Sequence, residues 1–164
     1  CRGKHEKLAS DIQDDLPGMA SWIRNHSRAS VFSDLWSPLA VIATNNEEMD
    51  AIQERIWMMT EHIENVAWMR NDVYARICHA DYSKGTALAE LERLLSIGVD
   101  EVFAIGDHLN DLAMLDPEVA GFIAAPNNSV PEVKEHVSSL DGRISEFSYG
   151  HAVANELAWL KSQG

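Results

Sequence analysis

Glu101-Val-Phe-Ala-Ile-Gly-Asp-His-Leu-Asn-Asp-Leu-Ala-Met-Leu115 is the stretch of this chain that decides its fold. It begins with a short apolar run, residues 102–105, which lies between an acidic pair and a glycine. Such a run is typical of a buried strand in a parallel sheet. Asp107 comes just after this strand, and Asn110 and Asp111 follow at the start of a short predicted helix.

These three polar side chains indicate a ligand site. In an open α/β sheet, ligands bind beyond the carboxyl ends of the strands. Two carboxylates and an amide at that edge predict a site for a hard cation such as Mg²⁺, which prefers oxygen ligands. A structural alternative stays open, because Gly-Asp after a strand is often only a turn and Asn110 could cap the helix.

A second motif lies upstream, where Ser83-Lys84-Gly85 introduces a predicted helix over residues 86–96. Lys84 stands at the helix start, where the helix dipole makes a positive charge mildly unfavourable. A cation beside two acids and a helix N-terminus suits a phosphoryl group. We therefore expect Lys84 to serve function and not the stability of the fold. The apolar side of this helix carries Ala87, Leu88, Leu91, Leu94 and Leu95.

The motifs occur in a fixed order: Ser83-Lys84-Gly85-x-Ala87-Leu88, then Gly106-Asp107-x-x-Asn110-Asp111-x-x-Met114-Leu115, then Ala120-Gly121-Phe122. This series resembles the haloacid dehalogenase (HAD) superfamily. More narrowly, it is similar to the Cof-type and sucrose-phosphatase-like hydrolases, which carry a large α/β cap. Residues 124–134 resemble the strand and helix that follow in the same group, so that the likeness covers about residues 81–160.

The resemblance implies roles for four residues. Lys84, Asp107, Asn110 and Asp111 would be catalytic, with Lys84 and Asn110 contacting the phosphoryl group. Asp107 would bind Mg²⁺ and Asp111 would hold its water shell. His108 stands where many members have glycine, and histidine is among the residues that tolerate the positive φ that glycine permits.

The implied fold is α/β: the C-terminal half of a HAD-like Rossmannoid core, a parallel sheet with helices, and part of an α+β cap. We expect the cap in residues 1–79 and the half-core in residues 80–164. Hydrophobic periodicity in the cap predicts helices over 4–16 and 17–25, strands over 29–36 and 39–44, a helix after residue 46, and strands over 65–70 and 73–79. Turns are expected at Ser37-Pro38 and Asn71-Asp72, a ligand-facing position at Trp68, and an amphipathic C-terminal helix over 151–161 with Val153, Leu157 and Leu160 on its apolar side.

The resemblance also implies a nucleophile that these residues lack. Members of the superfamily attack phosphate with an aspartate of an Asp-x-Asp motif, and no Asp-x-Asp occurs here. We therefore expect the chain to be a fragment whose nucleophile lies upstream. The implied function is a Mg²⁺-dependent phosphatase acting on a small phosphorylated metabolite such as a sugar phosphate. The alternative is an inactive fragment or a regulatory binding module of the same fold.

The amino-acid composition of the chain narrows the classes of molecule that it could bind. Acidic residues outnumber basic ones, 26 to 13, which gives a net charge of −13. This balance argues against nucleic acid or an anionic membrane as a partner, since both bind clustered Lys and Arg. The two cysteines, Cys1 and Cys78, form no disulfide framework, and we expect a reducing cytoplasm. The sequence predicts no oligomeric state.

Overall fold

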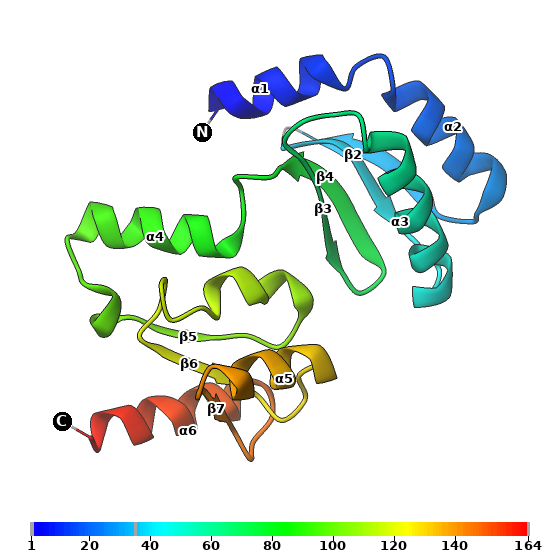
Figure 1. Ribbon diagram of the computed structural model, residues 1–164. Coiled ribbons are helices and arrows are strands. Elements are labelled where there is room, and N and C mark those ends of the chain that lie inside the picture. The colour runs from blue at the N-terminus through cyan, green and yellow to red at the C-terminus, as the bar shows by residue number, and fades with distance from the viewer. Residues whose placement is uncertain (1, 35, 164) are drawn as a thin grey trace. The chain divides into compact units, whose positions relative to one another are not determined.

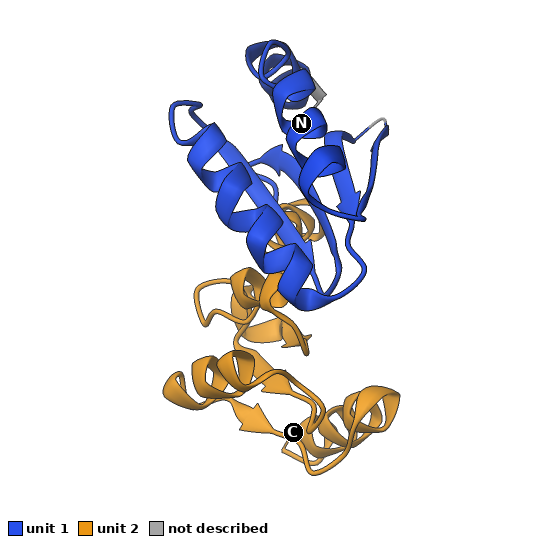
Figure 2. Cartoon of the chain, turned by 90° about the vertical axis from the view of Figure 1, so that its right-hand side faces the viewer, with its two compact units in different colours: residues 1–82 blue, residues 83–164 orange. Residues whose placement is uncertain are grey.

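The computed structural model describes residues 2–34 and 36–163, so that Cys1 lies outside the described residues. The chain divides into two compact units, residues 1–82 and 83–164 (Figure 2). Each unit has its own cluster of buried apolar side chains. Within the described ranges, no helix has the length and apolar character needed to cross a membrane.

Unit 1, residues 1–82, is built around a four-stranded antiparallel sheet in the order β1-β2-β4-β3 (Figure 1). The hairpin between β3 and β4 turns at Asp72, whose φ is 54°. The elements are α1 (Arg2–Asp11), α2 (Leu16–His26), β1 (Ser30–Asp34), β2 (Ser37–Ile42), α3 (Asn46–Thr60), β3 (Val66–Asn71) and β4 (Tyr74–His79).

One face of this sheet packs against the helices. Strand residues alternate between the two faces, and the alternate positions of β2 and β4 point to the helices. Trp68, expected to face a ligand, instead packs against this core beside its cross-strand partner Ile77. That interpretation of Trp68 is therefore wrong. The buried cluster consists of Leu8, Ile12, Met19, Ile23, Leu39, Val41, Ala43, Met49, Ile52, Ile56, Ala75 and Ile77.

Two boundaries in unit 1 differ from the sequence prediction. The first helix ends at Asp11, and Pro17 lies in the first turn of α2, where its missing N–H costs nothing. The turn expected at Ser37-Pro38 is wrong, because both residues belong to β2. The buried Ser37 hydroxyl donates a hydrogen bond to the Ile77 carbonyl at 3.0 Å, which joins β2 to β4 where Pro38 lacks a donor.

Asn45 is the N-cap residue of α3. The Asn45 side chain accepts a hydrogen bond from the Glu48 N–H at 2.8 Å. The Glu48 carboxylate in turn accepts from the backbone N–H groups of Thr44 and Arg28, each at 2.7 Å. These backbone hydrogen bonds lower the pKa of the Glu48 carboxyl below its ordinary value.

Unit 2, residues 83–164, contains a parallel sheet in the order β5-β6-β7 with helices around it (Figure 1). The predicted α/β fold class, a parallel sheet with helices together with an α+β unit, is confirmed. The elements are α4 (Lys84–Leu95), η1 (Val99–Glu101), β5 (Phe103–Ile105), η2 (Leu109–Met114), β6 (Phe122–Ala125), α5 (Pro131–Ser139), β7 (Arg143–Ile144) and α6 (Tyr149–Lys161).

The apolar faces of two helices in unit 2 differ from prediction. On α4, Leu88 packs against the core of the unit, but Leu91, Leu94 and Leu95 remain 48%, 63% and 59% exposed. On α6, the buried residues are Ala152 and Glu156, whereas the predicted Leu157 is 42% exposed and Val153 and Leu160 are half-buried.

An ion pair explains the burial of Glu156 in α6. Its carboxylate accepts a hydrogen bond from Arg143 Nε at 2.6 Å and another from the Asn155 side chain at 3.1 Å. Burial alone would raise the pKa of Glu156, but the hydrogen bonds from Arg143, Asn155 and Ser145 outweigh it and the pKa is lowered. Because the pairing is between residues 13 apart, helical periodicity could not predict which face of α6 is buried.

Candidate functional site

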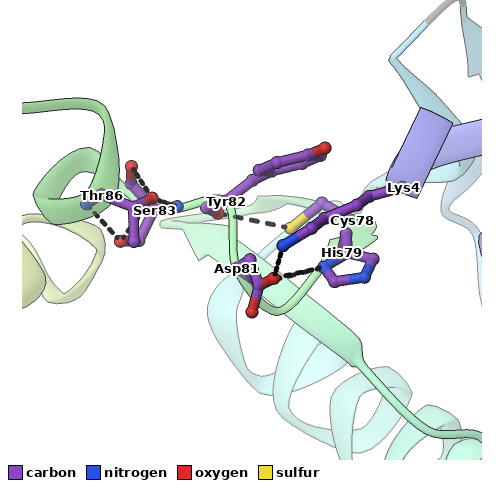
Figure 3. Close-up of polar contacts among 7 residues, drawn as sticks. All are labelled: Lys4, Cys78, His79, Asp81, Tyr82, Ser83 and Thr86. Carbon is purple, nitrogen blue, oxygen red and sulfur yellow. Dashed lines mark hydrogen bonds and ion pairs between the residues drawn. The ribbon is translucent and has the colours of Figure 1, made fainter. Parts of the chain in front are cut away.

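The first residue of the candidate site is held by a helix cap. Ser83 precedes α4, and its hydroxyl accepts a hydrogen bond from the Thr86 N–H at 3.1 Å. The Thr86 hydroxyl accepts one from the Ser83 N–H at 2.9 Å, which completes a capping box (Figure 3). The box fixes the start of α4, so that Lys84 is the first helical residue.

Figure 3 also shows the chain that leads into this cap. The Asp81 carboxylate lies 3.8 Å from Nδ1 of His79, the last residue of β4, and pairs with Lys4 of α1 at 2.5 Å. His79 Nδ1 also accepts a hydrogen bond from the Asp81 N–H at 3.1 Å. The neighbouring Cys78 is buried, and burial raises the pKa of its thiol. This setting agrees with a strand-end role for His79 and with an unreactive Cys78.

Lys84 and Asp111 meet in unit 2. The Lys84 ammonium pairs with Asp111 Oδ1, and only 5% of the Asp111 side chain is exposed. The other oxygen, Oδ2, accepts hydrogen bonds from the backbone N–H groups of Asp107 at 3.0 Å and His108 at 3.2 Å. Asp111 therefore ties Lys84 to the loop that follows β5.

The backbone of the loop after β5 is unstrained at His108. Its φ is −135° and its ψ is 167°, an extended conformation open to any residue. The positive φ considered for this position does not occur. Histidine at this position therefore needs no special backbone conformation.

Two glycines allow the motifs to approach one another. A Cβ at Gly106 would lie 2.4 Å from the Cβ of Asp111, so that a larger residue would displace this carboxylate. A Cβ at Gly85 would lie 1.9 Å from the carbonyl oxygen of Ala113 in η2. The glycine after Lys84 thus lets α4 contact η2 closely enough for the Lys84–Asp111 pair to form.

We expect Gly85→Ala to lower the free energy of unfolding by about 3 kcal/mol, because the added methyl group collides with backbone and not with a flexible side chain. Chemical denaturation monitored by circular dichroism measures the loss. Gly150→Ala is the matched control in the same unit, since a Cβ there meets nothing within 4 Å. Equal stability of the two variants would contradict the close approach of α4 and η2.

Asp107 differs from Asp111 in its surroundings. Its side chain is exposed, and Oδ2 accepts a hydrogen bond from the Asn128 amide at 3.0 Å. Within the described part of the chain, no hydrogen bond to its Oδ1 is found. The half-buried Asn110 side chain likewise makes no hydrogen bond to a described residue. The structure thus brings Lys84, Asp111 and the loop that carries Asp107 into contact. Asn110 lies near them because it directly precedes Asp111 in the sequence.

Among the residues of the candidate site, Asp107 is suited to supply one ligand of a magnesium ion. The described residues contain no group of three His, Cys, Asp or Glu side chains able to hold a metal. Mg²⁺ is commonly bound through one or two carboxylates, with water and substrate phosphate as the other ligands. Asp107 offers an exposed carboxylate of this kind. Both oxygens of Asp111 already have partners, so that its contribution would be to orient the loop.

The resemblance implies that the loop Pro126-Asn127-Asn128-Ser129 lies beside the site, but the sequence alone assigned no role to Asn128 or Ser129. Asn128 contacts the Asp107 carboxylate, and the buried Ser129 hydroxyl lies 3.4 Å from the Gly106 carbonyl oxygen. In the sequence this loop is marked by turn-forming residues directly after an apolar strand. In a parallel sheet, the ends of neighbouring strands lie at the same edge.

The family model for haloacid dehalogenase-like hydrolases matches residues 24–157. The chain belongs to this family. The resemblance predicted from the motifs is thereby confirmed, and the match extends beyond them into unit 1.

Curated relatives of this HAD-like chain include proteins named as phosphatases. YxeH of Bacillus subtilis, named for an inferred phosphatase activity, is 39% identical over 80 residues, which cover 49% of this chain and 29% of that protein. The phosphoglycolate phosphatase of Methanosarcina acetivorans is 32% identical over 82 residues, 50% of this chain and 34% of that protein. The chain spans about a third of the length of these relatives.

Solved structures support the fold. The sucrose-phosphatase of Synechocystis, in complex with sucrose and phosphate, superposes with a TM-score of 0.67 at 16% identity, over 91% of this chain and 62% of that one. Protein 0175 of Thermoplasma acidophilum gives a TM-score of 0.62 at 19% identity, over 90% of this chain and 61% of that one. At these identities the likeness is one of fold.

Proposed function

We propose that the protein containing these residues is a Mg²⁺-dependent phosphatase that hydrolyses a small phosphomonoester, such as a sugar phosphate. The observation that carries the proposal is the Lys84–Asp111 pair, whose second carboxylate oxygen holds the Asp107 loop. Through this contact the Lys84 ammonium, at the start of α4, is tied to the loop at the carboxyl end of β5, which carries the exposed Asp107 carboxylate. Phosphoryl transfer depends mainly on such positioning and charge stabilisation.

Each residue has a task in this mechanism. The Lys84 ammonium, oriented by Asp111, would bind a phosphoryl oxygen and offset the charge that develops during transfer. Asp107 would hold Mg²⁺, which when bound neutralises further phosphoryl charge. Asn110 would donate its amide N–H to the phosphate. The described contacts of Asp111 favour a positioning role, and a metal-shell role for it stays a prediction.

The nucleophile in this proposal is an aspartate outside these 164 residues, since the sequence contains no Asp-x-Asp. The names of two relatives favour small substrates: phosphoglycolate phosphatase, and 5-amino-6-(5-phospho-D-ribitylamino)uracil phosphatase of Bacillus subtilis, which is 32% identical over 88 residues. A cytoplasmic location would accord with the reduced, buried Cys78.

Phosphate release by the full-length protein tests the proposal. We expect release from at least one member of a panel of sugar phosphates and other small phosphomonoesters, and we expect chelation of Mg²⁺ to abolish it. Release that is indifferent to chelation would remove the metal from the mechanism. No release from any member would favour the alternative, a regulatory binding module of the same fold.

The 164-residue chain alone should not hydrolyse an aryl phosphate in the presence of Mg²⁺. The physical reason is that Lys84 and Asp107 can stabilise a transferring phosphoryl group but provide no Asp-x-Asp nucleophile to accept it. The full-length protein, assayed at the same concentration, is the control. Metal-dependent turnover by the purified chain would show that the roles are assigned wrongly.

A further inference from the structure

The side-chain amide of Asn128 is held at both ends. Its Nδ2 donates a hydrogen bond to Asp107 Oδ2 at 3.0 Å, and its Oδ1 accepts one from the Tyr149 N–H at 2.7 Å. A backbone N–H can only donate, so that the amide oxygen must face Tyr149. The NH₂ group must then face Asp107, where a carboxylate can only accept. The orientation of this amide is therefore fixed by its two partners.

The loop that carries Asn128 is anchored on both sides by backbone hydrogen bonds. The Val130 N–H donates to the Asp107 carbonyl oxygen at 3.0 Å, and the Asn127 N–H donates to the Phe147 carbonyl oxygen at 2.8 Å. These bonds hold the loop between the end of β5 and the segment before α6. Asn128 thus lies on a constrained backbone, as a group that orients another residue requires.

Tyr149 gives the oxygen end of the amide a separate structural task. Tyr149 begins α6 with a φ of 54°, in the left-handed region that is unfavourable for a residue with a Cβ. Its side chain is 72% exposed, so that packing contributes little to holding it there. The hydrogen bond to Asn128 Oδ1 offsets this strain. One side chain therefore stabilises α6 at one end and contacts the candidate site at the other.

We propose that Asn128 is a positioning residue for Asp107: it engages Oδ2 of that carboxylate and leaves Oδ1 available to a divalent cation. The inference rests on the proposed function, since the cation is the Mg²⁺ of that site. A neutral donor suits this task. A lysine in its place would offset the charge that attracts the cation, and an acid would repel the Asp107 carboxylate. Groups that orient a metal ligand in this way typically change metal affinity 10–100-fold when they are removed.

The test compares Asn128→Ala with Asn127→Ala in the full-length protein. Asn127 is the next residue of the same loop, and its hydrogen bonds to described residues involve only the backbone. Binding of Mn²⁺, which substitutes for Mg²⁺ at oxygen sites, is measured by electron paramagnetic resonance. We expect Asn128→Ala to weaken Mn²⁺ binding about 10–100-fold and Asn127→Ala to leave it unchanged. Equal Mn²⁺ binding by the two variants would overturn the proposal.

A second variant separates positioning from stability. Asn128→Ala also removes the partner of the Tyr149 N–H, and so should lower the melting temperature. Adding Tyr149→Gly relieves the left-handed strain without restoring the donor to Asp107, because glycine adopts positive φ freely. We expect the double variant to regain melting temperature but not Mn²⁺ affinity. Recovery of both together would show that Asn128 serves α6 alone.

A further test uses the unmodified protein, so that its result does not depend on whether a variant folds. The side-chain NH₂ resonances of Asn128 should shift when Mg²⁺ is added, whereas those of Asn127 should not. Absence of a selective shift would count against the proposal. If Mn²⁺ binding depends on both Asp107 and Asn128 but the protein releases no phosphate from any substrate, the proposed function fails while the positioning role stands.

Discussion

Replacing Asp107 with alanine in the full-length protein should lower kcat/KM by about 10³-fold and weaken Mg²⁺ binding together with it. A loss of that size corresponds to about 4 kcal/mol of transition-state stabilisation. The reason is that Asp107 is the exposed carboxylate of the site loop, so that its removal leaves a bound cation under-neutralised. The measurement is kcat/KM as a function of Mg²⁺ concentration.

Asp107→Asn sharpens this prediction. An asparagine oxygen can still accept the hydrogen bond from the Asn128 amide, so that the loop should keep its conformation and the protein its melting temperature. The negative charge is nevertheless gone. We expect metal affinity and kcat/KM to fall nearly as far as in Asp107→Ala. Glu135→Gln, which removes one exposed negative charge from α5 of the same unit, is the matched control.

A near-normal dependence on Mg²⁺ in both Asp107 variants would contradict the assignment. It would mean that the cation is held by other carboxylates and that Asp107 only shapes the loop. A lower melting temperature of Asp107→Asn would also indicate that Asp107 only shapes the loop. An exposed metal ligand should contribute little to the stability of the metal-free fold.

The sequence predicted the elements around this site because their signals are local. The run at residues 102–105 is apolar and ends at a glycine, and the structure has a strand at Phe103–Ile105. Ser83 lies three residues before Thr86, and the structure has a reciprocal cap between them. The Asn45 cap and the hairpin turn at Asp72 were predictable for the same reason. Each depends on neighbours within four residues.

Features set by distant partners could not be predicted in this way. Ser37 and Pro38 have the composition of a turn, but a hydrogen bond to Ile77, 40 residues away, keeps them in β2. The burial of Glu156 depends on Arg143. The position of the Asn128 side chain in the site depends on its hydrogen bonds to Asp107 and Tyr149, each 21 residues away. Periodicity carries no information about such pairs.

The roles of the two aspartates show the same limit within the site. From the sequence, Asp107 and Asp111 are two similar carboxylates four residues apart. In the structure, Asp111 is buried with both oxygens engaged, whereas Asp107 is exposed with one oxygen engaged by a neutral amide. The distinction arises from the loop conformation, in which the Asp107 and His108 N–H groups turn toward Asp111. Spacing alone could not specify that turn.

Lys84→Ala should lower kcat/KM of the full-length protein by at least about 10²-fold, a loss of roughly 2.7 kcal/mol of transition-state stabilisation. The Lys84 side chain is 46% exposed while its ammonium pairs with Asp111, and we expect the ammonium to remain accessible to a phosphoryl oxygen. Asp111 holds it in place without enclosing it. Steady-state kinetics below the melting temperature measure the loss, with Lys161→Ala, an exposed lysine at the end of α6, as the matched control.

The effect of Lys84→Ala on stability should differ from what the sequence suggested. The unfavourable position at a helix N-terminus predicts no loss, or a small gain, on removal of the charge. The structure adds the opposing fact that Asp111 is buried and would lose its cationic partner. Two backbone N–H groups still donate to Asp111, and Lys84 itself is half-exposed, so we expect a loss of only about 1 kcal/mol.

The substitution Lys84→Arg keeps the positive charge at this position and changes the shape of the group that carries it. A planar guanidinium cannot replace a compact ammonium where Gly85 packs α4 against η2 and Asp111 fixes the position of the charge. We expect it to recover the lost stability but little of the lost kcat/KM. If Lys84→Ala were strongly destabilised yet turned over substrate normally below its melting temperature, Lys84 would be a structural residue, and the phosphoryl site would have to lie elsewhere.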